Sequence, residues 1–533
     1  MNDSDHAPLV LLGLDACDVD LMQRWADDGR MPFLKSLLET GAFVRLDSTR
    51  RLFGDSPWPT ANTGTTPAKH AFYNHLQLQR GTTWIERVDA HHCRVLPFWS
   101  YLRGTGVKLG ALDVPKTFPI DGVDGVQICA WGEHYQLLKT AASEPPSAVD
   151  DIERRFGPYP HPPEVTVTRS HRQERGIYDT LSANLEKKRQ ATEYLLGLDD
   201  WDLFISVFSE IHYAGHQFYH HCHPGHWAHN PSTPDDLKDA LPRIHSELDA
   251  ALASVFEHLP ENTTYLVFSV HGLETNVSAN HLLHDILEKL GYLLPAQHPA
   301  PEDLLGRVLQ QTRKLREFIP DAARRFINTH LVSEAAHDRA HASAFSHGID
   351  WDQTRAFPLE GDHFQGFVSA NLKGREPHGT VEKGADLDAL LDEIRVELKQ
   401  LVNVETGEPA VHDVVRISDV YPGPSAEELP DLVVQWAGEG PIRAVRHPRV
   451  GTVSMEGFAL RQTQHAPDGF LIAGGPRIRA EAELDRASTL DLAPTILHLL
   501  GQPVPDDLDG QVLSDLLAPQ GESPLADVSP THT

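Results

Sequence analysis

Cysteine is scarce in this chain of 533 residues. It contains only four, far apart in the sequence: Cys17, Cys93, Cys129 and Cys222. No pair has the short spacing of a CxxC zinc module, and four scattered thiols do not form the dense framework of a disulfide scaffold. The pattern is typical of free thiols in a reducing compartment, which predicts a cytoplasmic location.

The sequence also lacks long apolar runs. No stretch approaches the roughly 20 apolar residues that a membrane span requires, and residues 1–6 lack the basic segment that opens a signal peptide. We therefore expect no membrane association.

Positive charge is in deficit. The chain has 46 Lys and Arg against 76 Asp and Glu, a formal net charge of -30. A general nucleic-acid binder would have a basic footprint, so a nucleic-acid polymer is excluded as the expected partner. A local positive pocket is still compatible with this charge, because a bound divalent metal would supply one.

Histidine, in contrast, is abundant, with 32 residues. This favours metal binding only weakly, because most histidines in proteins have other roles. A group that follows residue 216 is interpreted as surface histidines or as groups behind the metal ligands: His220, His221, His223, His226 and His229.

Two apolar runs end at histidines. Residues 264–270 read as a buried strand that stops at His271, and residues 201–208 lead into His212 and His216. In open α/β sheets, chemistry collects at the carboxyl ends of the strands. The His-x-x-x-His spacing places both imidazoles on one face of a helical turn.

Two further segments bring a polar residue to a strand. Residues 9–14 form an apolar strand that ends at Asp15, and His465 precedes a strand at 469–473. A helix at 19–38, broken at 29–32, follows the first strand, and a helix at 237–259 leads into the strand at 264–270. Strand, helix and strand in this order indicate an α/β fold with a mostly parallel central sheet.

The segment 52–64 combines hydroxyls, an acid and helix breakers before a possible helix. Such a loop can hold a nucleophile at a helix N-terminus, where an anion is favoured. The alternative is a turn capped by Ser, Thr or Asp.

The domain organisation is predicted from where the strand–helix alternation stops. Residues 295–350 read as charged helices, so we expect a helical insertion or cap that walls the site and sets substrate size. The first part of the catalytic core is then 1–294 and its second part 351–518. Residues 519–533 are expected to be a disordered tail.

Four motifs carry a family resemblance: Leu11-Leu-Gly-Leu-Asp15, Trp58-Pro-Thr-Ala-Asn-Thr-Gly64 with Pro67-Ala-Lys-His70, Ser269-Val-His-Gly272, and His465-Ala-Pro-Asp-Gly-Phe-Leu-Ile-Ala-Gly-Gly475. With them the chain resembles the alkaline phosphatase superfamily, in particular its type I phosphodiesterase/nucleotide pyrophosphatase branch. The resemblance implies a mostly parallel sheet flanked by helices and two metal ions, usually zinc, at the strand ends. It also implies hydrolysis of phosphate or sulfate esters through a hydroxyl nucleophile.

The resemblance assigns five metal ligands by position. Asp15 matches the metal carboxylate after the first strand, His216 and His465 match two histidines on one metal, and His271 matches the histidine on the other. His212 stands where the family has an aspartate, and would complete a three-histidine zinc site.

Two positions depart from the family. Val270 replaces the carboxylate beside His271, so that only Asp15 and His271 remain for the second metal, which should be weak or absent. Gly54 stands at the nucleophile position. The nearest replacements are Asp55, Ser56 and Thr60, of which Ser56 is the preferred candidate.

The resulting hypothesis is a metal-dependent hydrolase of phosphoric or sulfuric esters, most similar to a phosphodiesterase or nucleotide pyrophosphatase, acting on a small-molecule ester with one zinc. One alternative is a catalytically degenerate member that binds a phosphorylated or sulfated ligand, or a partner. A second alternative is an isomerase of the phosphomutase type.

Overall fold

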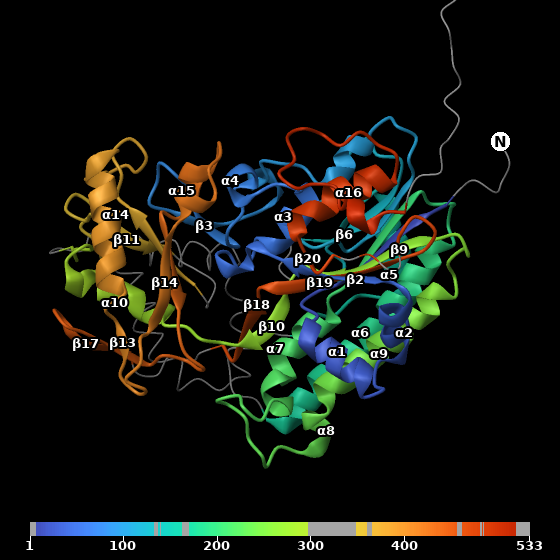
Figure 1. Ribbon diagram of the computed structural model, residues 1–533, viewed down its shortest axis with the longest axis horizontal. Helices are drawn as coiled ribbons and strands as arrows, with labels where there is room; N and C mark the ends of the chain where they lie inside the picture. The colour runs from blue at the N-terminus through green and yellow to red at the C-terminus, as the bar shows by residue number, and fades with distance from the viewer. Residues whose placement is uncertain are drawn as a thin grey trace, which may run out of the picture.

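The computed structural model describes residues 7–132, 137–138, 140–162, 170–296, 348–359, 365–455, 461–479, 482 and 484–518. They form two lobes that lie side by side, one around a nine-stranded sheet and one around a four-stranded sheet (Figure 1). Most of the predicted cap at 295–350, and the predicted tail at 519–533, lie outside the described residues.

The large sheet confirms the predicted α/β architecture. Its strands, from edge to edge, are β20 (Arg486–Ser488), β2 (Ala42–Asp47), β19 (Asp468–Gly474), β9 (Thr264–Ser269), β1 (Leu9–Leu14), β8 (Leu203–Phe208), β5 (Leu109–Leu112), β6 (Gly125–Cys129) and β7 (Ala142–Glu144). β19 and β7 run antiparallel to their neighbours, and the remaining strands share one direction. Because β1 lies between β8 and β9, the residues that follow these three strands meet at one edge of the sheet.

Helices cover both faces of this sheet. Along β1, Val10, Leu12 and Leu14 join one apolar core while Leu9 and Leu11 join the other, as the two-residue period of a strand requires. The helices of the first core are α1 (Val19–Asp27), α2 (Pro32–Thr40), α5 (Ser147–Phe156), α6 (His171–Leu196), α7 (Glu210–Cys222), α8 (Asp235–Lys238) and α9 (Ala240–Phe256). Those of the second are α3 (Pro57–Thr63) and α16 (Leu492–Leu499). In Figure 1 the sheet lies between α3 and α16 above and α1, α6, α7 and α9 below.

The small lobe has an apolar core of its own. Its antiparallel sheet has the order β11 (Ala356–Leu359), β12 (Gly366–Ala370), β15 (Leu432–Trp436) and β14 (Val411–Arg416). Around it lie α10 (Asn280–Leu290), α14 (Ala385–Leu398), α15 (Ile417–Val420) and the strands β13 (Val402–Asn403), β16 (Ala444–His447) and β17 (Gly451–Ser454). The segment 351–518 therefore builds this lobe first and only afterwards returns to the large sheet.

A two-stranded ribbon connects the lobes. β10 (Gly272–Thr275) leaves the large lobe directly after β9, and β18 (Thr463–Ala466) re-enters it directly before β19. The two strands pair antiparallel, with Leu273 opposite His465. The ribbon therefore brings the chain after β9 and the chain before β19 to the same place. Two shorter pieces follow α3 in the chain: α4 (Pro67–His70) and the hairpin of β3 (Leu76–Leu78) and β4 (Ile85–Arg87).

Within the described part of the chain, no helix combines the length and the apolar character that crossing a membrane would require. The cytoplasmic location stays a prediction from the sequence.

Candidate metal centre

The structure brings the five predicted metal ligands together at the carboxyl edge of the large sheet. Asp15 follows β1, His271 follows β9, and His465 lies in β18 of the ribbon. His212 and His216 stand on α7, which follows β8. All five side chains are buried, with exposed fractions between 2% and 7%.

Three imidazole nitrogens form a nearly equilateral triangle. The Nε2 atom of His212 lies 3.1 Å from that of His216 and 3.1 Å from that of His465, and the His216 and His465 atoms are 3.2 Å apart. Nitrogen ligands about 2.05 Å from a zinc ion at tetrahedral angles lie about 3.3 Å from one another. The triangle therefore fits three corners of a tetrahedral zinc site.

Neighbouring groups lie against the Nδ1 atoms of two of these histidines. His212 Nδ1 lies 2.8 Å from the Oδ2 atom of Asp15, which only accepts, and His216 Nδ1 lies 2.7 Å from the Thr463 hydroxyl. A neutral imidazole with its proton on Nδ1 has a lone pair on Nε2. Lone pairs that meet at about 3 Å repel one another unless a cation lies between them.

Both oxygens of Asp15 are engaged by donors. Trp58 Nε1 donates to Oδ1 over 2.7 Å, and His271 Nε2 lies 3.5 Å from the same oxygen. Burial raises the pKa of Asp15, but His212, His271 and the Trp58 N–H more than offset it and lower the pKa to about 2. A carboxylate that fixes a histidine through Nδ1 is a common partner of metal-binding imidazoles.

A second trio overlaps the first. Asp15, His212 and His271 have ligand atoms within 4.8 Å of one another, but they share His212 with the triangle. Val270, at the position of the family carboxylate, is fully buried and belongs to the apolar core that contains Trp58 and Phe268. The described residues thus offer one complete set of nitrogen ligands and an incomplete set beside it.

The candidate nucleophile segment forms a separate network. Ser56 precedes α3, and its Oγ lies 3.3 Å from Thr60 Oγ1; both side chains are fully buried. Asp55 Oδ2 accepts the backbone N–H of His75, and Oδ1 lies 3.8 Å from Lys116 Nζ. Trp58 is the residue through which this segment bonds to Asp15.

His70 sets the direction of hydrogen bonds in this network. Its Nδ1 accepts the backbone N–H of Phe72 over 3.0 Å, and its Nε2 lies 3.1 Å from Thr60 Oγ1. Burial lowers the pKa of His70 to about 3, against the opposing charge of Asp509, so the ring is neutral with its proton on Nε2. Thr60 therefore accepts from His70 and directs its own proton to Ser56 or to Thr49, which lies 3.5 Å away.

Asp55 is held as an anion. Burial raises its pKa, but the Lys116 ammonium and the hydrogen bonds of His75 bring it far below its ordinary range. The charge of Asp55 is therefore balanced by Lys116 and His75, and Asp55 is not part of the histidine triangle.

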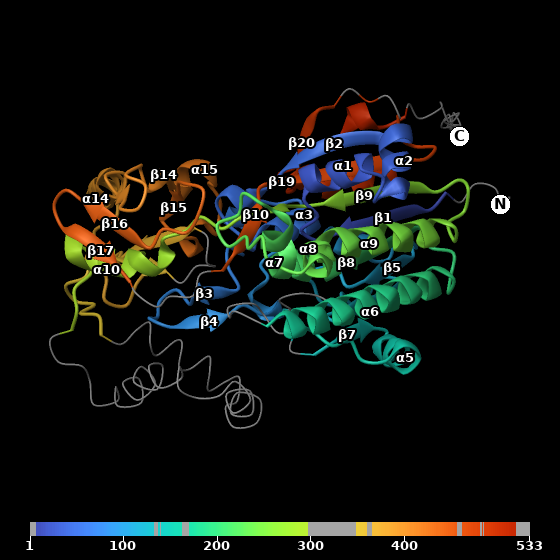
Figure 2. The same ribbon diagram turned by 90° about the horizontal axis from the view of Figure 1, so that it is seen from below.

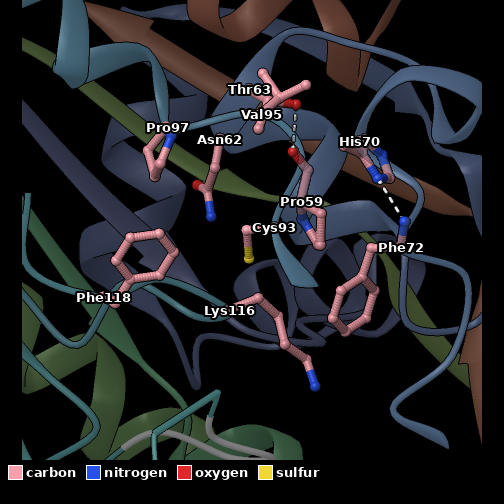
Figure 3. Close-up of a pocket in the computed structure, with 10 residues that line it drawn as sticks. All are labelled: Pro59, Asn62, Thr63, His70, Phe72, Cys93, Val95, Pro97, Lys116 and Phe118. Atoms are coloured by element: carbon pink, nitrogen blue, oxygen red, sulfur yellow. Dashed lines mark hydrogen bonds between the residues drawn. The ribbon is translucent and has the colours of Figure 1, made fainter. Parts of the chain in front are cut away.

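A cavity lies against α3 (Figure 3). The residues around it are Pro59, Asn62, Thr63, His70, Phe72, Cys93, Val95, Pro97, Lys116 and Phe118. His70 and Lys116 join this lining to the hydroxyl and Asp55 contacts, whereas none of the five predicted metal ligands belongs to it. The cavity is therefore a neighbour of the segment 54–60, distinct from the metal triangle.

Two residues of the centre were not singled out from the sequence. Thr463 stands two positions before His465 in the same strand, so the strand period places both on one face. Trp58 was noted only as part of a motif, although its indole N–H is a donor that a buried carboxylate would accept. A polar residue two positions from a ligand that is predicted to lie in a strand can therefore indicate a second residue of the same site.

Comparison with known proteins gives the family. The model of the family described as type I phosphodiesterase / nucleotide pyrophosphatase matches residues 9–441. No curated protein sequence matches the chain.

Solved structures share the fold at low identity. Wild-type alkaline phosphatase PafA has a TM-score of 0.54 and 12% identity, with 97% of this chain and 100% of that chain covered. Phosphonoacetate hydrolase from Sinorhizobium meliloti 1021, in complex with phosphonoformate, has a TM-score of 0.51 and 14% identity, with 93% and 95% covered. The same hydrolase in complex with phosphonoacetate has a TM-score of 0.51 and 13% identity over the same shares.

These neighbours confirm the alkaline-phosphatase-like architecture that the motifs implied. The family match spans β1, α3, α7 and β9, which carry or precede four of the five predicted ligands, and it continues through most of the small lobe; β18, which carries His465, lies beyond it. The chain belongs to the type I phosphodiesterase / nucleotide pyrophosphatase family.

Proposed function

We propose that this protein is a metal-dependent hydrolase of phosphoric esters, with phosphodiesters as its main substrates, and that it uses one zinc ion. The observation that carries the proposal is the triangle of Nε2 atoms of His212, His216 and His465, with edges of 3.1–3.2 Å. When bound, zinc would supply Lewis-acid polarisation of a phosphoryl oxygen.

The charge of the centre supports a diester. Three neutral imidazoles contribute no charge, and Asp15 contributes one negative charge as a carboxylate that accepts from Trp58 Nε1 and lies 2.8 Å from His212 Nδ1. A divalent ion leaves the centre with one net positive charge, which complements the single negative charge of a phosphodiester. This local charge is of the opposite sign to the formal net charge of the whole chain, which is -30.

One ion, rather than the two of the wider superfamily, is supported by two features. His212 Nδ1 lies 2.8 Å from Asp15 and is not available to a second cation while it donates there. Val270 offers an apolar side chain within a packed core where a carboxylate would be needed. Asp15 then acts as a positioning residue for His212.

Ser56 is the proposed nucleophile. Its Oγ is the nearer of the two hydroxyl neighbours to which Thr60 directs its proton, at 3.3 Å. A hydrogen bond donated to an oxygen stabilises negative charge on it, as a nucleophile requires. Attack by water is the alternative route, since Gly54 stands at the family's nucleophile position.

A second candidate function is binding of a phosphorylated or sulfated ligand without turnover. Two observations favour it: Gly54 has no side chain, and the hydroxyls of Ser56 and Thr60 are both fully buried. Such a protein would keep the zinc ion and the ligand affinity and would lack hydrolysis.

Zinc content and ester hydrolysis test the proposal together. Purified protein is analysed for metal and assayed with bis(p-nitrophenyl) phosphate, with p-nitrophenyl phosphate and p-nitrophenyl sulfate for comparison. We expect fastest hydrolysis of the diester, and we expect His216→Ala/His465→Ala to lose one equivalent of zinc and the activity. His258→Ala, at an exposed histidine just after α9, is the matched control.

The outcomes separate the candidates. Zinc without hydrolysis of any of the three esters supports the binding function, and an unchanged zinc content in the double variant rejects the site. Ser56→Ala should lower diester hydrolysis by at least about 100-fold at unchanged zinc content. Retained activity in Ser56→Ala would instead assign the attack to water.

A further inference from the structure

A second group of metal-ligating side chains lies where α6 packs against α7. Glu174 stands in the first turn of α6, and His220 and His221 stand in the last turn of α7. All three are more than nine-tenths buried, with exposed fractions of 7%, 7% and 5%. The sequence analysis left open whether His220 and His221 are surface histidines or groups behind the metal ligands, and both are interior residues.

The three side chains are close enough to share an ion. His221 Nε2 lies 3.0 Å from Glu174 Oε1, and the ring centroids of His220 and His221 are 3.8 Å apart. One ligand atom from each of the three lies within 4.8 Å of the others. The second nitrogen of His221 lies 3.4 Å from the Thr233 hydroxyl, an oxygen that can fix the ring.

Two polar atoms of this group are buried without a hydrogen-bond partner among the described residues. They are the second carboxylate oxygen, Glu174 Oε2, and the ring nitrogen His220 Nδ1. Buried polar atoms are almost always paired, so two in one cluster call for an explanation. A cation bound between these side chains would satisfy both.

Charge leads to the same conclusion. Among the described residues, the ion-pair partner of Glu174 is His221, and no Lys or Arg pairs with it. A buried carboxylate beside imidazole nitrogens is an arrangement that a divalent cation stabilises.

We infer that Glu174, His220 and His221 form a second metal site, for zinc or a similar divalent transition metal, which fastens the end of α7 to α6. Two imidazoles and one carboxylate are a known zinc-ligand set, whereas calcium and magnesium prefer oxygen ligands. The site is separate from the centre described above, because His220 lies one helical turn, about 6 Å along the axis, beyond His216.

A hydrogen bond alone is the competing explanation. The Glu174–His221 contact would tie the two helices without any ion, as many buried Glu–His pairs do. It would leave Glu174 Oε2 and His220 Nδ1 unpaired, which is the observation that the ion explains.

Zinc stoichiometry in the wild type and three variants tests the inference. Protein purified with zinc present and then dialysed should hold two equivalents as wild type, and one in His216→Ala/His465→Ala. Glu174→Gln and His220→Asn, made separately, should each reduce the wild-type content by one equivalent. Glutamine keeps an acceptor for His221, so a purely structural hydrogen bond predicts an unchanged zinc content in Glu174→Gln.

A second measurement distinguishes loss of the zinc site from misfolding of a variant. In the His216→Ala/His465→Ala background, adding zinc to metal-free protein should raise the unfolding temperature, and Glu174→Gln should abolish that rise. His258→Ala should retain both the zinc content and the rise. The inference is overturned if the His216→Ala/His465→Ala variant holds no zinc, or if Glu174→Gln retains the zinc content of its parent. A zinc content of one equivalent in the wild type that stays unchanged in His216→Ala/His465→Ala would reject the proposed hydrolase centre and would support the site at Glu174.

Discussion

His212 uses its two ring nitrogens for two different tasks. Nδ1 lies against Asp15, and Nε2 completes the triangle with His216 and His465. An aspartate at this position, as in the family pattern, would bind a metal without needing a partner of its own. A histidine has to be oriented, and Asp15 is placed to do so.

Asp15→Asn tests whether Asp15 orients His212 or binds the metal itself. The amide oxygen can accept from only one of the two donors, His212 or Trp58, while its N–H₂ group faces the other. We expect zinc affinity at the centre to fall by about 10–100-fold, as for other groups that support a ligand. Competition with a chelator of known affinity measures it.

Asp20→Asn, in an exposed ion pair with Arg45, is the control and should leave the affinity unchanged. Complete loss of the zinc ion in Asp15→Asn would show that Asp15 is a ligand. In the metal-free protein, the lowered pKa of Asp15 favours the folded state above about pH 4, and this contribution is lost as the pH falls toward 2. The asparagine variant should lack this part of the acid destabilisation.

The sequence predicted which side chains lie together at this edge of the sheet better than it predicted the bonds among them. Asp15, His212 and His271 were identifiable because each follows an apolar strand, and strands of a parallel sheet end together. The Trp58–Asp15 bond was not, because it joins side chains 43 residues apart and depends on the path of a loop. The contacts of Ser56 depend on the path of the same loop, so the sequence did not predict them either.

Helix α7 and the ribbon of β10 and β18 set the shape of the triangle. Gly215 stands on α7 between His212 and His216, and a Cβ atom there would lie 1.9 Å from Leu273 Cδ1 in β10. Leu273 is the ladder partner of His465. The absence of a side chain at Gly215 therefore lets the helix approach the strand that positions the third histidine.

Gly215→Ala should loosen the metal centre although alanine favours a helix by about 1 kcal/mol over glycine. The added methyl group has to displace Leu273, and such overpacking costs about 1–3 kcal/mol. We expect zinc affinity to fall by at least about tenfold, measured by chelator competition, with diester hydrolysis reduced in parallel.

Leu273→Ala provides the matching test. It removes the atom that the new methyl group would meet, so Gly215→Ala/Leu273→Ala should bind zinc more tightly than Gly215→Ala alone. The single Leu273→Ala variant completes the double-mutant cycle. Additive effects of the two changes would show that this contact does not control the site.

The sequence predicted the helices and strands themselves well, but it did not predict which sheet each strand joins. The break between α1 and α2 follows from Gly29 and from Pro32, which becomes the first residue of α2. β12 and β15 lie in the segment 351–518, which was expected to form the second part of the core, but they belong to the smaller sheet. Apolar periodicity reports that a strand is buried, whereas its partners lie far away in the sequence and leave no local signal.

At the scale of the whole molecule, the lobes are joined by more than the ribbon. Arg80, in the hairpin of β3 and β4, bonds to Glu376 and to the Leu429 carbonyl of the small lobe. The Arg80 guanidinium is therefore held by an ion pair and by a backbone carbonyl, which together fix its orientation. The hairpin lies against the small lobe (Figure 2), and Leu78 of β3 belongs to the apolar core of that lobe, so the chain between α3 and β5 is a second connection between the lobes besides the ribbon.

The net charge of the whole molecule acts on substrate approach. A formal charge of -30 repels an anionic ester at long range. The centre itself carries one positive charge in our proposal, but that field acts over a short distance. The two effects have opposite salt dependence, so ionic strength tells them apart.

We expect kcat/KM for bis(p-nitrophenyl) phosphate to increase with salt. The screening length shrinks from about 30 Å at 0.01 M to about 8 Å at 0.15 M, so repulsion by distant acidic residues fades first. A rise of roughly two- to tenfold over this range would fit long-range repulsion, and p-nitrophenyl phosphate, with its larger negative charge, should show the steeper rise. Zinc content, measured at each salt concentration, controls for loss of the ion. A fall in kcat/KM with salt would mean that the positive field of the metal centre governs the encounter and that the acidic surface lies away from the path of the substrate.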